Sequence, residues 1–252
     1  MSEPLKVLSW NVLAQAYIGY LPHQAQIESA EKRYACVAAK INAWNPDIAL
    51  LQEVDQDCLI HLYQHLSGFR IFYAQRPEGK PDGLATLIRS GLNVLSSRVR
   101  YFQDVGSNKK ARLGQSTILD VDGRRLLVGN VHFAYDDAPH TRHEGIFEAK
   151  QYFGGLPLGV VDAAVIGGDW NAEIEHPLLQ LALSYGFQDA IPQKKETCRA
   201  NGRSWAVDHL IHQPCFQSEV WLQPSLEGNK VYPNTEFPSD HLPIGVRLSW
   251  KG

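Results

Sequence analysis

Six short segments of this sequence place chemically capable side chains where a predicted strand ends. The residue types are asparagine, carboxylate and histidine, and they follow or close apolar runs. A single Asp or Asn in such a position is most often a turn or cap residue. Six of them in one chain favour a shared function, because a rigid scaffold presents functional groups at strand ends and in the loops after them. The segments are Trp10-Asn11, Gln52-Glu53, Asn130-Val131-His132, Gly167-Gly168-Asp169-Trp170-Asn171, Val207-Asp208-His209 and Ser239-Asp240-His241.

The carboxylates in these segments predict a site for a hard divalent cation. Mg2+ takes oxygen ligands, typically one or two carboxylates together with water and substrate phosphate. Glu53 is the best candidate ligand, with the amide oxygen of Asn11 beside it and Asp240 completing the site directly or through water. Together with Asp169 and Asp208, these carboxylates would repel one another in one pocket, which is a further indication of a metal. We expect Mg2+, with Mn2+ as an alternative.

Four motifs resemble those of the endonuclease/exonuclease/phosphatase superfamily, which includes the DNase I-like nucleases. They are Ser-Trp-Asn-Val at 9–12, Leu-Leu-Gln-Glu-Val at 50–54, Gly-Gly-Asp-Trp-Asn-Ala at 167–172 and Pro-Ser-Asp-His-Leu-Pro at 238–243. Each motif is a modest signal alone, but all four in this order are specific, and the resemblance runs from Val7 to Val246. It implies an α/β fold, a four-layer sandwich of two mixed β-sheets flanked by helices. It also implies metal-dependent hydrolysis of a phosphoester.

The resemblance further implies a role for each polar residue. Asp169 orients or deprotonates the attacking water, and Asn171 holds the phosphate and Asp169 in place. These two residues are two positions apart, so they can project to the same side of an extended chain. His241 hydrogen-bonds a phosphoryl oxygen while Asp208 fixes its tautomer. His132 contacts the phosphate and assists departure of the leaving group. Water would attack in line, without a covalent enzyme intermediate.

Four residues near these motifs are candidates for binding substrate: Asn130, Trp170, Arg142 and Phe237. Trp170 and Phe237, together with Trp205, border the motifs and could stack on a nucleobase. Packing into the core or at the rim of the site is the alternative for each aromatic residue. Arg142 follows His132 closely enough to line a substrate entrance, or it lies in a solvated loop.

Within the superfamily, the sequence most resembles the group of poly(A)-removing deadenylases, nocturnin and 2′-phosphodiesterases. The shared features are the segment from Trp10 to Ala14, an Asp82-Gly83 pair before a mid-chain strand, and Pro-Ser-Asp-His at 238–241. The tyrosyl-DNA phosphodiesterase branch shares Gln-Glu-Val and Phe-Pro-Ser-Asp-His, so it stays open. His209 departs from the deadenylase group, which more often has Tyr after the catalytic Asp.

The resulting expectation is a phosphodiesterase acting on the end of a nucleic acid, in the manner of a 3′ exonuclease or deadenylase. The alternative is a phosphatase or phosphodiesterase of a small phosphorylated metabolite, a lipid headgroup or 5′-tyrosyl-DNA. A non-catalytic binding protein on the same fold is a third class, disfavoured because all the expected polar positions are present. The sequence indicates no protein partner.

Hydrophobic patterning predicts many strands with helices between them, in one domain spanning residues 1–252. Apolar residues at steps of three and four mark a helix from Ile27 to Trp44, and Asn45-Pro46 ends it. Asp122-Gly123 is a strong hairpin signal. Two stacked sheets with helices outside would bury both kinds of element. The predicted strands are 5–12, 47–54, 84–88, 94–102, 114–121, 125–133, 163–166, 206–211, 217–222 and 242–248, with further helices at 141–153 and 177–185.

The composition excludes several classes of protein. The chain has 252 residues, a formal net charge of −3, 44% hydrophobic and 20% charged residues. It is therefore neither generally disordered nor a protein that holds long nucleic acid by bulk charge. The four cysteines show no paired-ligand or redox spacing, which favours reduced thiols. No signal peptide is visible, and no apolar run approaches the roughly 20 residues of a membrane span. We therefore expect a cytoplasmic protein.

Overall fold

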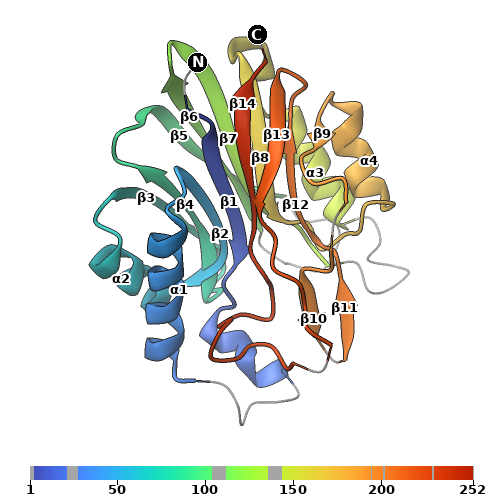
Figure 1. Ribbon diagram of the computed structural model, residues 1–252. Helices are drawn as coiled ribbons and strands as arrows, with labels where there is room; N and C mark the ends of the chain where they lie inside the picture. The colour runs from blue at the N-terminus through green and yellow to red at the C-terminus, as the bar shows by residue number, and fades with distance from the viewer. Residues whose placement is uncertain are drawn as a thin grey trace.

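The computed structural model describes residues 3–21, 28–103, 112–135, 144–193, 195–200, 202–228 and 230–251. Within these ranges the chain forms two mixed six-stranded sheets stacked on each other (Figure 1). The first sheet has the order β13 (Phe216–Leu222), β14 (Ile244–Trp250), β1 (Leu5–Asn11), β2 (Ile48–Asp55), β4 (Asp82–Arg89) and β3 (Phe69–Gln75). The second has the order β5 (Asn93–Tyr101), β6 (Leu113–Val121), β7 (Arg124–His132), β8 (Ala163–Asp169), β12 (Asp208–His212) and β9 (Gln188–Asp189).

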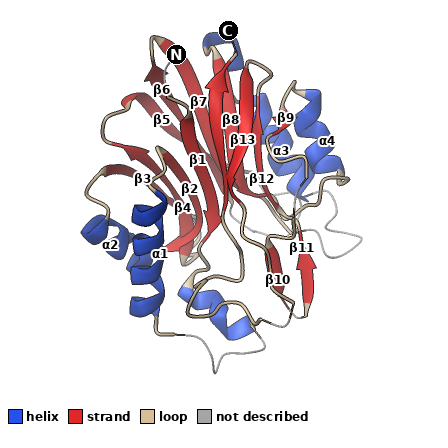
Figure 2. Cartoon of the chain, viewed as in Figure 1, coloured by secondary structure: helices blue, strands red, loops and turns tan. Residues whose placement is uncertain are grey.

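Helices cover the outer faces of the two sheets (Figures 1 and 2). Helices α1 (Ala30–Trp44) and α2 (Gln56–His65) lie on the first sheet, and α3 (Glu144–Gly154) and α4 (Pro177–Ser184) lie on the second. The other described elements are a ribbon of β10 (Cys198–Ala200) and β11 (Arg203–Trp205) and two 3-10 helices, η1 (Gln15–Tyr20) and η3 (Leu158–Val160). The predicted α/β four-layer sandwich is confirmed.

Apolar residues that alternate along the central strands build the four layers. In β2, Ile48 and Leu50 pack between the sheets, whereas Ala49 and Leu51 pack against α1 and α2. In β8, Val165 joins the same inner core, and its neighbours along the strand join the core under α3 and α4. Successive side chains of a strand point to opposite faces. A run of consecutive apolar residues in a strand is therefore buried on both sides, as it is in β2 and β8.

Two parallel strand pairs determine where the polar strand ends meet. β1 pairs with β2 and β7 pairs with β8 in parallel, and each crossover contains a helix, α1 in the first and α3 in the second. Asn11, Glu53, His132 and Asp169 lie at or near the carboxyl ends of these strands. β12 runs antiparallel to β8 and begins at Asp208, directly opposite Asp169. One edge of the sandwich therefore collects the polar residues from both sheets.

The elements predicted from the sequence do not include α2, the edge strand β3 and the short strands β9, β10 and β11. In β3, Phe69 packs toward the helices and Phe72 packs between the sheets, so apolar residues on both faces hide the alternation typical of a strand. The helix predicted from Ile27 is α1, which begins at Ala30 because the Ser29 hydroxyl accepts a hydrogen bond from its first turn. Among the described residues, none of the helices is long and apolar enough to cross a bilayer.

Candidate active site

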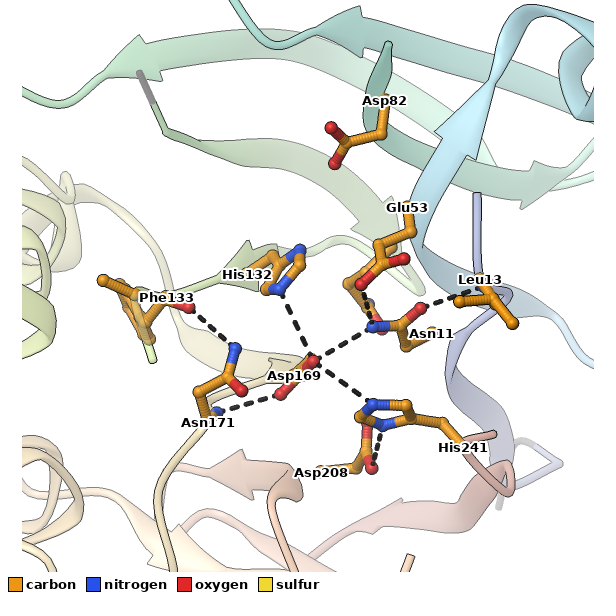
Figure 3. Close-up of polar contacts among 12 residues, drawn as sticks. Asn11, Leu13, Glu53, Asp82, His132, Phe133, Asp169, Asn171, Asp208 and His241 are labelled. Atoms are coloured by element: carbon orange, nitrogen blue, oxygen red, sulfur yellow. Dashed lines mark hydrogen bonds and ion pairs between the residues drawn. The ribbon is translucent and has the colours of Figure 1, made fainter. Parts of the chain in front are cut away.

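Asp169 lies at the centre of a polar cluster formed by the strand ends (Figure 3). Its Oδ2 atom accepts a hydrogen bond from Asn11 Nδ2 at 3.0 Å, and its Oδ1 atom accepts one from the backbone N–H of Asn171 at 2.9 Å. Two imidazoles face Oδ2, with Nε2 of His132 3.5 Å away and Nε2 of His241 3.7 Å away. Asp169 itself is 1% exposed. These predicted site residues therefore converge on one buried carboxylate.

Two local features of the backbone bring these side chains together. The register between β2 and β4 is interrupted between Leu51 and Val54, and Glu53 there adopts a left-handed φ of 54°. A bulge of this kind bends the strand and redirects a side chain. In β8, Gly168 runs so close to β7 that a Cβ atom would lie 1.9 Å from the Val131 carbonyl oxygen. Glycine is required there, because any side chain would push the two strand ends apart.

The Asn11 amide is hydrogen-bonded through both its oxygen and its nitrogen, and its orientation is determined by a backbone donor. Nδ2 donates to Oε1 of Glu53 at 2.9 Å as well as to Asp169, and Oδ1 accepts the Leu13 N–H at 3.0 Å. Because that N–H can only donate, the amide oxygen must face it and the nitrogen must face the carboxylates. The Leu13 N–H uses one of the two lone pairs of that oxygen, so the prediction that Asn11 offers its oxygen to a metal stays a prediction. The nitrogen of the same amide positions the two carboxylates.

His241 is held through both its ring and its backbone. Nδ1 of the ring donates to Oδ2 of Asp208 at 2.9 Å, and Asp208 is fully buried. The Trp10 indole N–H donates to the His241 carbonyl at 2.9 Å, and Ser239 Oγ accepts the His241 N–H at 3.1 Å. Ser239 Oγ also donates to the Asn11 carbonyl at 2.7 Å. A buried carboxylate on one ring nitrogen fixes the orientation of the ring and determines which nitrogen faces the cluster.

The two histidines of the cluster differ in charge. Burial alone would lower the pKa of His241, but nearby groups, led by Cys198 and Asp208, outweigh it and hold that pKa well above its usual value. Burial, reinforced by the positive charge of Arg112, lowers the pKa of His132 well below its usual value. At neutral pH His241 is therefore a charged hydrogen-bond donor, and His132 is a neutral ring.

The carboxylates of the cluster fit a divalent metal ion. Burial and the nearby Asp240 raise the pKa of Glu53 to about 7. Burial raises the pKa of Asp169 to about 6, and burial also raises the pKa of Asp240. Ligand atoms of Glu53, His132 and Asp169 lie within 4.8 Å of one another. A cation would relieve the unfavourable burial and crowding of these negative charges, and oxygen-rich donors suit a hard cation.

Two of the predicted substrate contacts are wrong, because their side chains are fully buried. Trp170 is 0% exposed and packs edge-on against Phe133, with ring centroids 5.3 Å apart, so no base can stack on it. Asn130 is also 0% exposed, and its Nδ2 donates to the carbonyl oxygens of Leu51 and Ala85 at 3.1 and 3.2 Å. Asn130 thereby ties the second sheet to the first beneath the site.

The other two predicted substrate contacts stay predictions. Phe237 is half-buried, with the Lys40 ammonium 4.6 Å from its ring centroid and the Tyr232 ring 6.3 Å away. Neither contact tests whether a base stacks on Phe237. Arg142 lies outside the described residues.

Arg33 is a positioning residue that sequence patterning does not reveal. It is 2% exposed, and its guanidinium donates to the carbonyl oxygen of Leu13 at 2.7 Å and to that of Pro238. These carbonyls belong to the loops that follow Asn11 and precede Asp240. A charged residue within an amphipathic helix is usually solvated. The only indication in the sequence that Arg33 is buried is its position next to the apolar residues of the helix.

Asp82 is a further buried carboxylate on the Glu53 side of the cluster (Figure 3). It accepts hydrogen bonds from the Tyr17 hydroxyl at 2.6 Å and from Arg76 Nη1 at 3.3 Å. Its charge contributes to the raised pKa of Glu53. In the sequence, this carboxylate is part of the Asp82-Gly83 pair that resembles the deadenylase group.

A cavity of about 270 Å³ opens beside Asn171. Its aromatic lining consists of Tyr135, which is 45% exposed, and the half-buried Trp205 of β11. Its volume is just below the roughly 300–1,000 Å³ of typical small-molecule sites. The residues that line it are Tyr135, Asn171, Ala172, Glu173, Glu175, His176, Trp205 and Val207.

Two stacked mixed sheets between helices, with a polar cluster at the ends of their parallel strands, have the architecture of a DNase I-like fold. The chain belongs to the Endonuclease/Exonuclease/phosphatase family, whose model matches residues 8–241. The prediction of a phosphoester hydrolase is thus confirmed at the level of the family.

Individual relatives agree with this assignment. The chain is 28% identical over 134 residues to "Probable RNA exonuclease NGL3" of Saccharomyces cerevisiae, a match covering 52% of this chain and 22% of that protein. It is 22% identical over 284 residues to "Nocturnin" of Mus musculus, covering 98% of this chain and 66% of that protein. The matches thus span between about a fifth and two thirds of these curated relatives. The crystal structure of ANGEL2, "a 2',3'-cyclic phosphatase", has the same fold, with a TM-score of 0.77, 16% identity and coverage of 98% and 95% of the two chains.

Proposed function

We propose that this chain is a divalent-metal-dependent phosphodiesterase that hydrolyses a phosphoester at the end of a nucleic acid, as a 3′ exonuclease or deadenylase does. The observation that carries the proposal is the position of Asp169 between Asn11, a neutral His132 and a charged His241. A buried carboxylate with a raised pKa is suited to accept a proton. The adjacent charged imidazole is suited to stabilise negative charge that develops beside it.

Each residue of the cluster has its own role in the proposed reaction. Asp169 orients the water and accepts its proton, while Asn11 and the Asn171 N–H hold the carboxylate in place. His241 donates a hydrogen bond to a phosphoryl oxygen, and His132 contacts the phosphate on the leaving-group side. The Asn171 side chain, whose Nδ2 donates to the Phe133 carbonyl at 3.0 Å, lies at the edge where the phosphate would enter.

Glu53 and Asp240 are the proposed ligands for Mg2+, with Mn2+ as an alternative. When bound, the ion would neutralise charge on the phosphoryl group and on the leaving oxygen. Glu53 already has its two oxygens oriented by Asn11 Nδ2 at 2.9 Å and by the Ala14 N–H at 3.2 Å. Asp240 is close enough to raise the pKa of Glu53. The Glu53 carboxylate is thus oriented before any ion binds.

The cavity beside Asn171 supports a nucleotide as the substrate. Trp205 and Tyr135 offer aromatic surface on which a base can stack. Glu173 and Glu175 also line the cavity, so a second phosphate is disfavoured there by charge. A base or ribose next to the scissile phosphate fits this lining. The printed name of the yeast relative, an RNA exonuclease, agrees with such a substrate.

A small phosphoester is the second candidate substrate, and the size of the cavity favours it. About 270 Å³ holds one nucleoside rather than a stretch of strand, and the net charge of −3 provides no general attraction for a long polyanion. ANGEL2, which has the same fold, is named as a 2′,3′-cyclic phosphatase. A nucleoside cyclic phosphate, a dinucleotide phosphate or another phosphorylated metabolite would satisfy the same site.

A substrate panel tests the proposal. Purified protein with Mg2+ is assayed on oligo(A) RNA, abasic duplex DNA, 5′-tyrosyl DNA, nucleoside 2′,3′-cyclic phosphates, nicotinamide dinucleotide phosphates and phosphoinositides. Asp169→Ala should reduce turnover by about 10²–10⁴-fold, whereas the exposed Asp57→Ala on α2 should not. Activity on a small phosphoester alone would replace the first candidate substrate by the second. Equal activity of wild type and Asp169→Ala would overturn the proposed mechanism.

A further inference from the structure

The ribbon of β10 and β11 brings a cysteine against the candidate active site. The N–H of Arg199 donates to the Asp240 carbonyl at 3.0 Å, and Cys198 and His241 form an antiparallel bridge. Side chains that are directly opposite in an antiparallel pair lie on the same face and close together. Cys198 is a free thiol. Its side chain therefore lies beside the imidazole that we propose for phosphate binding.

Three different donor types meet at this point. A sulfur of Cys198, a carboxylate oxygen of Asp240 and a ring nitrogen of His241 lie within 4.8 Å of one another. The three residues are 7%, 8% and 7% exposed. Tetrahedral zinc with bonds of about 2.0–2.3 Å holds its ligands about 3.5 Å apart, so shifts of about 1 Å complete such a site. Mg2+, which requires hard oxygen ligands, would not use the sulfur.

Asp208 adds a feature that zinc sites share. Its carboxylate already binds Nδ1 of His241 at 2.9 Å, which leaves the second ring nitrogen as the ligand. Zinc-binding imidazoles almost always donate their other ring N–H to a carboxylate, a carbonyl or water in this way. Asp208 therefore keeps the proton on Nδ1, so that loss of the Nε2 proton leaves the imidazole in the tautomer that a zinc ion needs.

We propose that Cys198, Asp240 and His241 form an inhibitory site for Zn2+ or another thiophilic divalent cation, with a donor set that shares only Asp240 with the ligands proposed for Mg2+. Binding forms a zinc–thiolate bond and a zinc–imidazole bond, and it releases two protons to solvent, one from the Cys198 thiol and one from the Nε2 atom of the His241 imidazolium, with no change of oxidation state. His241 is then withdrawn from the phosphoryl group, and Asp240 is withdrawn from the Glu53 side. The inhibition rests on the proposed function, but the binding of the ion does not.

The sulfur distinguishes this site from its neighbours. Among the described residues, the two other clusters of possible ligands are Glu53 with His132 and Asp169, and Asp169 with Asp208 and His241. Neither contains a cysteine, so a thiolate bond to a metal reports Cys198 and not the carboxylate site. This difference allows a spectroscopic test that needs no substrate.

Cobalt spectroscopy and zinc inhibition together test the proposal. Co2+ added to the metal-free protein should produce a thiolate-to-cobalt charge-transfer absorption that is lost in Cys198→Ser and kept in Cys215→Ser, the matched control for another free thiol. With saturating Mg2+ and the best substrate, the Zn2+ concentration for half inhibition should rise about tenfold or more in Cys198→Ser. It should not change in Cys215→Ser. Each value is taken relative to the activity of the same variant without Zn2+.

Each outcome decides one part of the proposal. No thiolate absorption in the wild type, or absorption retained in Cys198→Ser, overturns the metal site. Unchanged zinc inhibition in Cys198→Ser means that zinc acts at the carboxylates, and it overturns the inhibitory role. A thiolate signal in a protein that turns over no phosphoester upholds the binding site and contradicts only the proposed function. If Cys198→Ser does not fold, Cys198→Ala and a variant with Cys198 as its sole cysteine replace it, and the latter must keep the absorption.

Discussion

Replacing Arg33 with Met tests whether the loops that carry the polar cluster are held in place from α1. Met removes the charge and every donor while keeping an unbranched, flexible side chain. The carbonyl oxygens of Leu13 and Pro238 would then stay buried without the guanidinium that they now bind. At about 1–3 kcal/mol for each unsatisfied buried group, the free energy of unfolding should fall by about 2–6 kcal/mol.

The same substitution should also reduce activity. Leu13 holds a left-handed φ of 58°, which a non-glycine residue adopts only when its surroundings enforce it. Without Arg33, relaxation of this loop would shift Asn11 and, through the Pro238 side, Asp240. A misplacement of about 1 Å in a catalytic group costs about 10²-fold in rate. We therefore expect kcat/KM to fall by about that factor in protein that is still folded.

Urea unfolding followed by circular dichroism measures the first effect, and kcat/KM on the best substrate measures the second. Lys32→Met is the matched control, because Lys32 is adjacent on α1, its side chain is 70% exposed and its ion pair with Glu28 is on the surface. That control should stay within about 0.5 kcal/mol of the wild type. If Arg33→Met is as stable and as active as Lys32→Met, the guanidinium does not hold the loops and the reasoning is refuted.

Four further predictions concern the metal, the charges and the substrate. EDTA should abolish turnover and Mg2+ or Mn2+ should restore it, and full turnover in chelator would contradict the metal. In EDTA the melting temperature should be higher at about pH 6.5 than at about pH 8. The pKa values of Glu53 and Asp169 are raised to about 7 and about 6 in the folded protein. The folded protein therefore binds protons that the unfolded chain has already released, and this binding stabilises the fold at the lower pH. The lowered pKa of His132 opposes this effect, most strongly below about pH 6.5 and to a decreasing extent up to about pH 7.5. A melting temperature that rises with pH across the window would contradict the crowding of carboxylates. Asp208→Asn should lower kcat by about 10²–10⁴-fold with little change in KM, because it removes the negative charge beside the His241 imidazolium. Steady-state kinetics that show a change only in KM would contradict this role. Trp205→Ala should raise KM for a nucleotide substrate by about 5–150-fold, the equivalent of about 1–3 kcal/mol of base stacking. An unchanged KM would contradict the proposal that a base stacks in the cavity.

The residue types of the site are predictable because apolar runs that end in Asn, Glu, His or Asp are visible in the sequence. Their orientation is not predictable, since it depends on partners far away in the chain. Asn11 presents its nitrogen to the carboxylates because its oxygen faces a backbone N–H. Trp170 lies between two site residues, yet its side chain packs in the core under α3 and α4, just after the end of β8. Arg33 shows the same limit, because a buried cation whose partners are backbone carbonyls has no pattern of its own.

The site exists only when the two sheets are stacked. Asn11 and Glu53 come from the first sheet, whereas Asp169 and His132 come from the second. The Asn11 amide uses one hydrogen for a carboxylate of each sheet, at 2.9 and 3.0 Å, so it joins the halves at the point of reaction. Packing of the inner core therefore positions the catalytic atoms as well as stabilising the fold. This explains why the two parallel strand pairs gain a chemical meaning only when their carboxyl ends face one another.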